Sequence, residues 1–174
     1  NGEKKINATE KKKVVKWSSM VASKNPIEDL IETYKLLFPG KNVTPMIFSS
    51  ASKNSNLEVF NKYVSKSAKK HGFPSLIYSN QEWSSEEFEE KLKAGNFLGA
   101  KSYLTFAPDY MPVKEIRIFD FIPHHHLKVL NRLGKILMLH IPRDARLKDP
   151  VNLAQMLEIE EKYPNIKLII AHVG

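Results

Sequence analysis

The chain contains no cysteine, which excludes a disulfide framework, a thiolate metal site and a cysteine nucleophile. Any metal ion must therefore be bound by histidine and carboxylate side chains. The sequence also lacks an apolar run close to the ~20 residues that cross a bilayer, and no signal-peptide-like apolar segment follows its N-terminus. These absences predict a soluble, cytoplasmic protein that does not bind membranes.

Glycine is sparse, and the seven glycines are scattered without a G-x-G-x-x-G turn, which disfavours a dinucleotide-binding domain. The 174 residues are 42% hydrophobic and 26% charged, close to the averages of globular proteins, so a wholly disordered chain is excluded. A chain of this length buries a substantial core and forms one domain.

The net charge of +8 is unevenly distributed. Residues 1–16 hold six lysines and two glutamates, which is a charge of +4 and half of the total. We expect a basic loop over 1–16 and a single domain over 17–174. A run of lysines is most often solvated, so nucleic acid is disfavoured as a partner. The alternative function is a non-catalytic basic α/β module that contacts nucleic acid or acidic surfaces.

From residue 25 onward, helical patterns alternate with short apolar runs typical of strands. The expected helices span 26–38, 57–71, 85–94, 124–133 and 150–163. The expected strands span 43–48, 75–78, 97–106, 135–140 and 167–171, and residues 107–123 form a loop or a short extended piece. Five strand–helix units predict an α/β fold with a parallel sheet, either doubly wound or wrapped as part of a barrel.

Polar residues stand where the apolar runs end. In parallel sheets and barrels, ligands bind at the carboxyl ends of the strands. His140 and His172 end consecutive strands, and neighbouring strands lie ~4.8 Å apart, so both imidazoles are expected at one rim, where they can share a metal ion or a metal–water pair. Imidazole suits zinc, iron or manganese. The alternative is that each histidine only hydrogen-bonds a loop.

Three segments resemble the amidohydrolase superfamily, in particular its amidohydrolase-related (ACMSD-like) metal-dependent hydrolases. They are Gly-Ala-Lys-Ser-Tyr (99–103), Lys-Ile-Leu-Met-Leu-His-Ile-Pro-Arg (135–143) and Lys-Tyr-Pro-Asn-Ile-Lys-Leu-Ile-Ile-Ala-His-Val-Gly (162–174). The resemblance implies a partial (β/α)8 TIM barrel. It also implies that His140 is the strand-five metal ligand, and that His172 is the strand-six histidine, a second ligand or the catalytic base.

The activity implied by this resemblance is hydrolysis of a small anionic ester, lactone or amide through a metal-activated water, or decarboxylation. A divalent metal, most plausibly zinc, would lower the pKa of a bound water and polarise a substrate oxygen. His172 would then move the proton. The expected partner is a small-molecule substrate, and assembly into a homo-oligomer stays open.

Two cations are candidates for binding the substrate. Lys101 is expected in the fourth strand; in some amidohydrolases a lysine there is carbamylated and bridges two metals, whereas in the ACMSD-like branch a charged residue orients the substrate. We favour substrate orientation, and an exposed strand-end lysine is the alternative. Arg143 can hold a carboxylate with two hydrogen bonds. Its alternative is surface pairing with Asp144 or Asp149.

The sequence departs from the family pattern at both ends. The opening His-x-His pair and the aspartate that ends the eighth strand are not found in these residues. We therefore expect strands two to six of a barrel, inactive alone. The run His124-His125-His126 begins a helix, where successive side chains point ~100° apart and cannot converge on one ion, so we interpret it as structural.

Overall fold

The computed structural model describes residues 25–50 and 55–171. The chain divides between Val43 and Thr44 into two compact units. In the first unit, α1 (Ile27–Leu37) begins directly after Pro26, as predicted, and the Tyr34 and Phe38 rings lie 5.7 Å apart near its C-terminus. The basic segment 1–16 and His172 lie outside the described residues, so the expected domain boundaries stay predictions.

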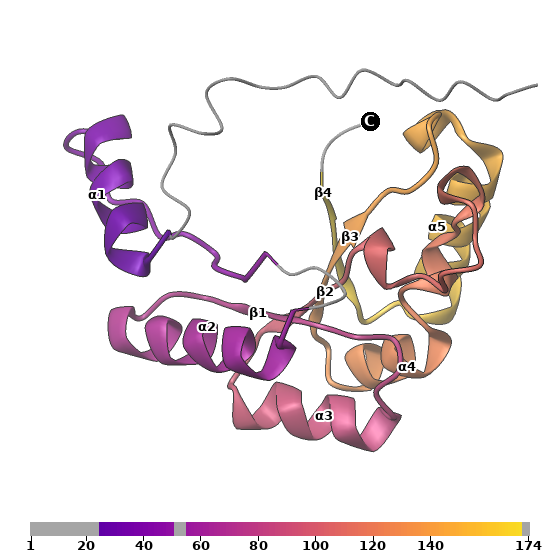
Figure 1. Cartoon of the computed structure of the whole chain (residues 1–174), viewed down its shortest axis with the longest axis horizontal. Coiled ribbons are helices and arrows are strands. Elements are labelled where there is room, and N and C mark those ends of the chain that lie inside the picture. The colour runs from indigo at the N-terminus through magenta and orange to yellow at the C-terminus, as the bar shows by residue number, and fades with distance from the viewer. Residues whose placement is uncertain (1–24, 51–54, 172–174) are drawn as a thin grey trace, which may run out of the picture. The chain divides into compact units, whose positions relative to one another are not determined.

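The second unit is built on a parallel sheet of four strands, drawn in Figure 1. The strands are β1 (Leu76–Tyr78), β2 (Gly99–Lys101), β3 (Ile136–His140) and β4 (Lys167–Ala171). They pair in the order β1-β2-β3-β4, so each crossover places the next strand beside the previous one. This is the arrangement of consecutive strands in a (β/α) barrel, and the described strands show no reversal of order of the kind found in a doubly wound sheet. The predicted partial barrel is confirmed.

Four helices connect or precede these strands: α2 (Leu57–His71), α3 (Ser85–Ala94), α4 (His124–Arg132) and α5 (Pro150–Lys162). Their ends follow from local sequence signals. The Ser84 hydroxyl accepts a hydrogen bond from the Glu87 amide at 3.1 Å, and the Asp149 carboxylate accepts one from the Val151 amide at 2.9 Å. Gly72 ends α2 with φ of 69°, a conformation that glycine adopts without a steric penalty.

The two faces of β3 differ in burial. Leu137, Leu139 and Ile141 alternate along the chain and are at most 1% exposed, so they form the centre of the core. Met138 and His140 point to the opposite face, because successive side chains of a strand alternate. The register pairs Lys101 of β2 with Met138, so Lys101 lies on that second face as well. The second face therefore carries the polar residues of the strand ends.

Two of the predicted strands are wrong in extent. In place of a strand over 43–48, only Ile47 pairs, through one parallel bridge to Ser75; Pro45 has no amide hydrogen to extend the ladder. The strand expected over 97–106 stops at Lys101. There the Ser102 hydroxyl donates to the Ser79 carbonyl at 3.2 Å, and the chain continues into a 3-10 turn at Leu104–Phe106.

The three consecutive histidines have structural partners, as the sequence indicated. His124 Nδ1 lies 2.8 Å from the Tyr163 hydroxyl. Nε2 of His125 and Nε2 of His126 both lie 2.9 Å from the Trp83 carbonyl oxygen, which can accept both N–H groups. The His126 ring stacks on Phe88 at 4.1 Å and is 2% exposed. These contacts fix the start of α4 against the loop that leads into α3.

No helix within the described ranges is long and apolar enough to cross a membrane.

Burial of His126 predicts a loss of stability in mild acid. Burial lowers the pKa of His126 from 6.5 to about 4, so the unfolded chain binds a proton that the folded chain does not bind between these values. The free energy of unfolding should fall as the pH falls from 6.5 to 4, by up to about 3 kcal/mol from this residue. Urea unfolding at several pH values measures this fall. His126→Phe should remove this pH-dependent fall in stability, and His124→Gln should retain it. An equal fall in both variants would contradict its assignment to His126.

Candidate active site

A hollow of about 330 Å³ opens at the carboxyl ends of β1 and β2. Its lining, which defines the strand-end hollow, comprises Phe48, Ser49, Ser50, Tyr78, Lys101, Tyr103 and Thr105. Tyr78 is the last residue of β1 and Lys101 the last residue of β2. Hydroxyl groups, aromatic rings and one ammonium group therefore meet at the edge where parallel sheets bind ligands.

Lys101 is the charged group of the strand-end hollow. Its Nζ atom lies 3.9 Å from the centre of the Phe48 ring, within the range of a cation–π interaction. Burial lowers the pKa of Lys101, and within the described part of the chain no carboxylate forms an ion pair with its ammonium group. Lys101 can thus offer its charge to an anionic ligand.

The Ser49 hydroxyl and the Tyr78 backbone, which also belong to the hollow, differ in their hydrogen bonding. The Ser49 hydroxyl oxygen is buried and has no hydrogen-bond partner among the residues that the structure describes. The backbone of Tyr78, by contrast, is held at both ends by Asn61 of α2: Asn61 Nδ2 donates to the Tyr78 carbonyl, and the Tyr78 amide donates to Asn61 Oδ1, each at 2.9 Å. Burial, and in second place Tyr103, raises the pKa of the Tyr78 hydroxyl.

His140 lies beside the hollow. It ends β3, is 5% exposed, and its ring centre is 4.4 Å from that of Tyr103 at an interplanar angle of 56°. Because Lys101 pairs with Met138, two residues before His140, the Cα atoms of Lys101 and His140 lie roughly 8 Å apart at the usual strand spacings. The structure thus brings these two predicted residues to one edge, and Tyr103 lies against His140 and also lines the hollow.

His172, the second predicted metal ligand, lies outside the described residues. The strand register pairs His140 with Ala171, and Ala171 immediately precedes His172 in the sequence. Within the described ranges there is no group of three or more histidine, aspartate or glutamate side chains that could hold a metal ion. Of the two predicted metal ligands, only His140 lies within the described residues, and its role as a ligand stays a prediction. The shared metal site of His140 and His172 stays a prediction.

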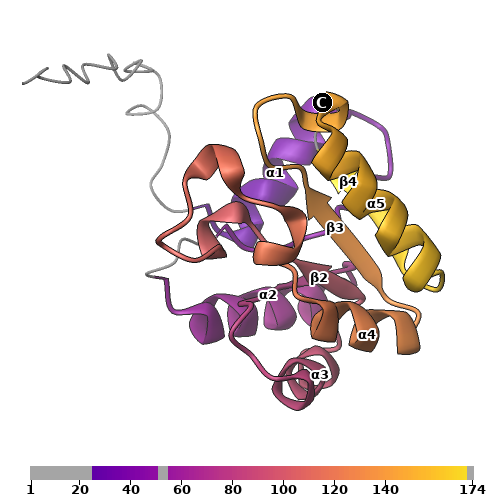
Figure 2. The same ribbon diagram turned by 90° about the vertical axis from the view of Figure 1, so that its right-hand side faces the viewer.

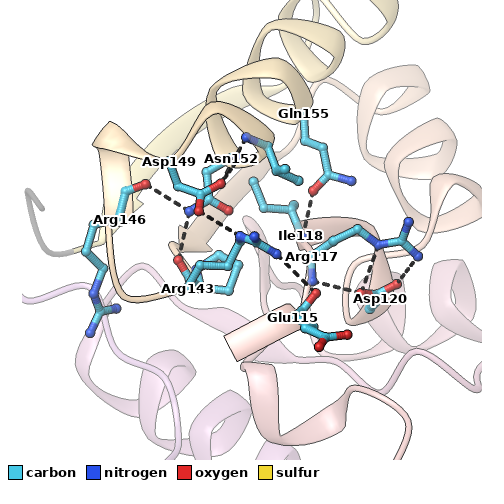
Figure 3. A network of polar contacts seen from close by, with 11 residues as sticks. Glu115, Arg117, Ile118, Asp120, Arg143, Arg146, Asp149, Asn152 and Gln155 are labelled. Atoms are coloured by element: carbon cyan, nitrogen blue, oxygen red, sulfur yellow. Dashed lines mark hydrogen bonds and ion pairs between the residues drawn. The ribbon is translucent and has the colours of Figure 1, made fainter. Parts of the chain in front are cut away.

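Arg143 is engaged elsewhere, as Figure 3 shows. Its Nε lies 2.8 Å from Oδ2 of Asp149 and its guanidinium donates to the Glu115 carbonyl at 3.4 Å. The guanidinium holds the pKa of the Asp149 carboxyl below its usual value, and the same carboxylate caps α5. This is the surface pairing that the sequence left open for Arg143, and Arg143 does not line the strand-end hollow.

Sequence reasoning did not single out Tyr103 or Phe48 as site residues. Both lie in segments expected to be regular strands, in which an aromatic residue is ordinarily part of the core. The available signal was spacing: Tyr103 follows Lys101 by two residues, which places both on one side of an extended chain.

No family model matches the chain, and no curated protein sequence matches it. Among solved structures, a dihydroorotase from Campylobacter jejuni is similar at 18% sequence identity and a TM-score of 0.42. The match covers 68% of this chain and 34% of the dihydroorotase, so it spans about a third of that protein. The parallel, sequential strand order of the sheet is what shows the barrel-type fold.

The contact between Asn61 and Tyr78 predicts a large loss of stability when the side-chain amide of Asn61 is removed. Asn61→Leu leaves a buried N–H and a buried C=O of Tyr78 without partners, so the free energy of unfolding should fall by roughly 2–4 kcal/mol. Ser65→Ala removes one part-buried hydrogen bond from the same helix to the Gly95 carbonyl and should cost about 1 kcal/mol or less. Urea denaturation compares the two variants, and an equal loss would show that Asn61 does not hold β1.

Proposed function

We propose that this chain carries part of the active site of a metal-dependent hydrolase of amidohydrolase type that acts on a small anionic substrate. The observation that carries the proposal is the placement of His140 beside the strand-end hollow, at the carboxyl edge of a barrel-type sheet. The hollow contributes a half-buried ammonium group with no carboxylate partner within the described residues. A metal-ligating residue type and an anion-binding group thus lie at one rim.

His140 and His172 are the proposed ligands of a divalent metal, which we propose to be zinc. When bound, such an ion supplies a water molecule of lowered pKa and polarises a substrate carbonyl. His140 acts as a ligand in its neutral form, and its buried ring lies against Tyr103, which limits the orientations of the imidazole. In the alternative assignment, His172 does not bind the metal and is instead the base that accepts a proton and returns it to the leaving group.

Lys101 and Ser49 are proposed to bind the anionic group of the substrate. The Lys101 ammonium supplies charge, and the buried Ser49 hydroxyl supplies a donor whose hydrogen-bonding capacity is unused among the described residues. Tyr103 both lines the hollow and contacts the His140 ring, so it connects the proposed anion site to the proposed metal ligand. Arg143 has no part in this proposal, because Asp149 and Glu115 occupy its guanidinium.

This geometry favours hydrolysis of a small ester, lactone or amide that also carries a carboxylate, because Lys101 and His140 lie at the same edge of the sheet. Decarboxylation, the second reaction expected from the resemblance, uses the same residues with a proton delivered to carbon in place of water addition to a carbonyl. A pair of substrates that differ only in which bond reacts would distinguish the two.

Metal content tests the proposed role of His140. The purified chain, dialysed against buffer with zinc and then without it, should retain bound metal measurable by elemental mass spectrometry. His140→Ala should lower the retained metal at least tenfold, because one ligand is lost. His125→Ala, whose ring contacts the Trp83 carbonyl, is the matched control and should retain the metal. Equal metal in the chain with and without His140, or none in either, would contradict the proposal.

Anion binding tests the proposed role of Lys101. Calorimetric titration with succinate, a small dicarboxylate, should show Lys101→Met binding ten to a hundred times more weakly, the usual effect of losing a hydrogen bond to a charged group. Lys135→Met is the control, because the Lys135 ammonium donates to the Phe97 carbonyl at 2.9 Å and does not line the hollow. Equal weakening by both variants would indicate a general effect of charge.

A further inference from the structure

A second cavity, of about 240 Å³, lies between α2 and α3 and shares no lining residue with the strand-end hollow. The two helices lie next to each other in both Figure 1 and Figure 2. This α2–α3 pocket is lined by Asn61, Lys62 and Ser65 of α2, by Lys91 of α3, and by Trp83, Ile77 and Phe97 among others. Neither the sequence patterns nor the proposed hydrolase activity uses this set of residues.

The inner wall of the α2–α3 pocket is apolar and fixed. Ile77 and Phe97 are 1% and 2% exposed, so they form a fixed floor beneath the pocket and offer a ligand little surface of their own. Trp83 adds an indole ring, and its backbone carbonyl lies 2.9 Å from the imidazoles of both His125 and His126. A dry apolar cavity of ~150 Å³ is enough to bind benzene, so this pocket has room for a ring with a short substituent. Its wall therefore suits a small aromatic ligand.

The two lysines that line the pocket differ in whether they form ion pairs. Lys91 Nζ lies 3.1 Å from Glu58 and 3.4 Å from Glu87, and 5.2 Å from the centre of the Trp83 ring. Those two carboxylates are therefore already paired. Lys62, on the same rim, forms no ion pair with any described acidic residue. The pocket thus presents one available cation, which complements an anionic ligand.

The remaining polar groups refine the ligand class. Both polar atoms of the Asn61 side chain bind the Tyr78 backbone, so Asn61 is committed to the fold. The Ser65 hydroxyl donates to the Gly95 carbonyl at 2.9 Å, which leaves its oxygen as an acceptor. A ligand with one O–H or N–H on its ring would satisfy that oxygen.

We propose that the α2–α3 pocket binds a small aromatic carboxylate, with the ring against Trp83, Ile77 and Phe97 and the carboxylate at Lys62. The site is separate from the strand-end hollow, and the proposal does not depend on the hydrolase activity. The probe that carries these features is 4-hydroxyphenylacetate: one ring, one hydroxyl donor and one carboxylate. Its neutral counterpart, 4-hydroxyphenylacetamide, lacks only the charge.

Tryptophan fluorescence reports on this pocket directly. The chain has two tryptophans, so Trp17→Phe leaves Trp83 as the single emitter when excited at a wavelength that phenols do not absorb. Titration with 4-hydroxyphenylacetate should change Trp83 emission along a saturable curve, with a Kd below about 1 mM for a ligand of this size. The amide should bind at least fivefold more weakly, because it lacks the charge for Lys62.

Three further variants in the Trp17→Phe background locate the ligand. Ala94→Leu fills the pocket from an exposed helical position and should abolish saturable binding. Lys62→Gln should weaken the carboxylate at least fivefold and leave the amide unchanged. Lys66→Gln, a lysine of the same helix that does not line the pocket, should bind as the parent does.

Specific results would overturn the proposal. A linear, non-saturable change, or the same curve in Ala94→Leu with its helical circular dichroism intact, would place the ligand outside the pocket. Equal affinity for the carboxylate and the amide, or equal weakening by Lys62→Gln and Lys66→Gln, would contradict recognition of the charge by Lys62. If Ala94→Leu does not fold, the comparison of Lys62→Gln with Lys66→Gln still tests the proposal. Both lysines are exposed on α2, so neither change should disturb folding.

Discussion

The parallel pairing of consecutive strands is the constraint on which the site depends. Each strand lies beside the previous one and runs in the same direction, so the residues that end the strands arrive at one edge. The hydrogen-bond register then fixes their offsets: Lys101 pairs with Met138, and His140 pairs with Ala171. The position of an ammonium group relative to an imidazole is therefore set by backbone hydrogen bonds, which are far less adjustable than the side chains themselves.

Some buried polar groups of this chain are satisfied within the fold, whereas others, including the Ser49 hydroxyl of the strand-end hollow, have no hydrogen-bond partner among the described residues. Both polar atoms of the Asn61 side chain form hydrogen bonds with the Tyr78 backbone. The His126 ring stacks on Phe88, and its Nε2 lies within hydrogen-bond distance of the Trp83 carbonyl oxygen. These contacts join a helix to a strand, to a loop or to a neighbouring helix, and they stabilise the fold. In the strand-end hollow, by contrast, the Ser49 hydroxyl and the Lys101 ammonium keep unused binding capacity toward the described residues. Unused capacity at one edge is what a ligand site requires.

Sequence predicted those elements whose signals are local. Ser84 and Asp149 cap α3 and α5 within their own first turns, and the uninterrupted apolar runs of β3 and β4 need no distant partner to be recognised. The strand predicted over 43–48 was wrong because the local effect of Pro45 was underweighted. The predicted end of β2 was wrong because a tertiary contact, the hydrogen bond from Ser102 to Ser79, decides it. His140 followed from the rule for strand ends, whereas Lys101 was a candidate through the family resemblance and was expected inside a longer strand. Tyr103 was missed because its contact with His140 depends on where β2 stops.

The short strand β1 lies between the strand-end hollow and the α2–α3 pocket and contributes a residue to each. Successive side chains of a strand point to opposite faces, so Ile77 lines the α2–α3 pocket while Tyr78 lines the strand-end hollow. Asn61 lines the first cavity and holds the backbone of the residue that lines the second. Each cavity therefore takes one lining residue from β1, whose position is fixed by pairing with β2 and by the Asn61 side chain. A change that shifts β1 must alter both cavities, whereas a change at Lys62 or Lys101 alters only one.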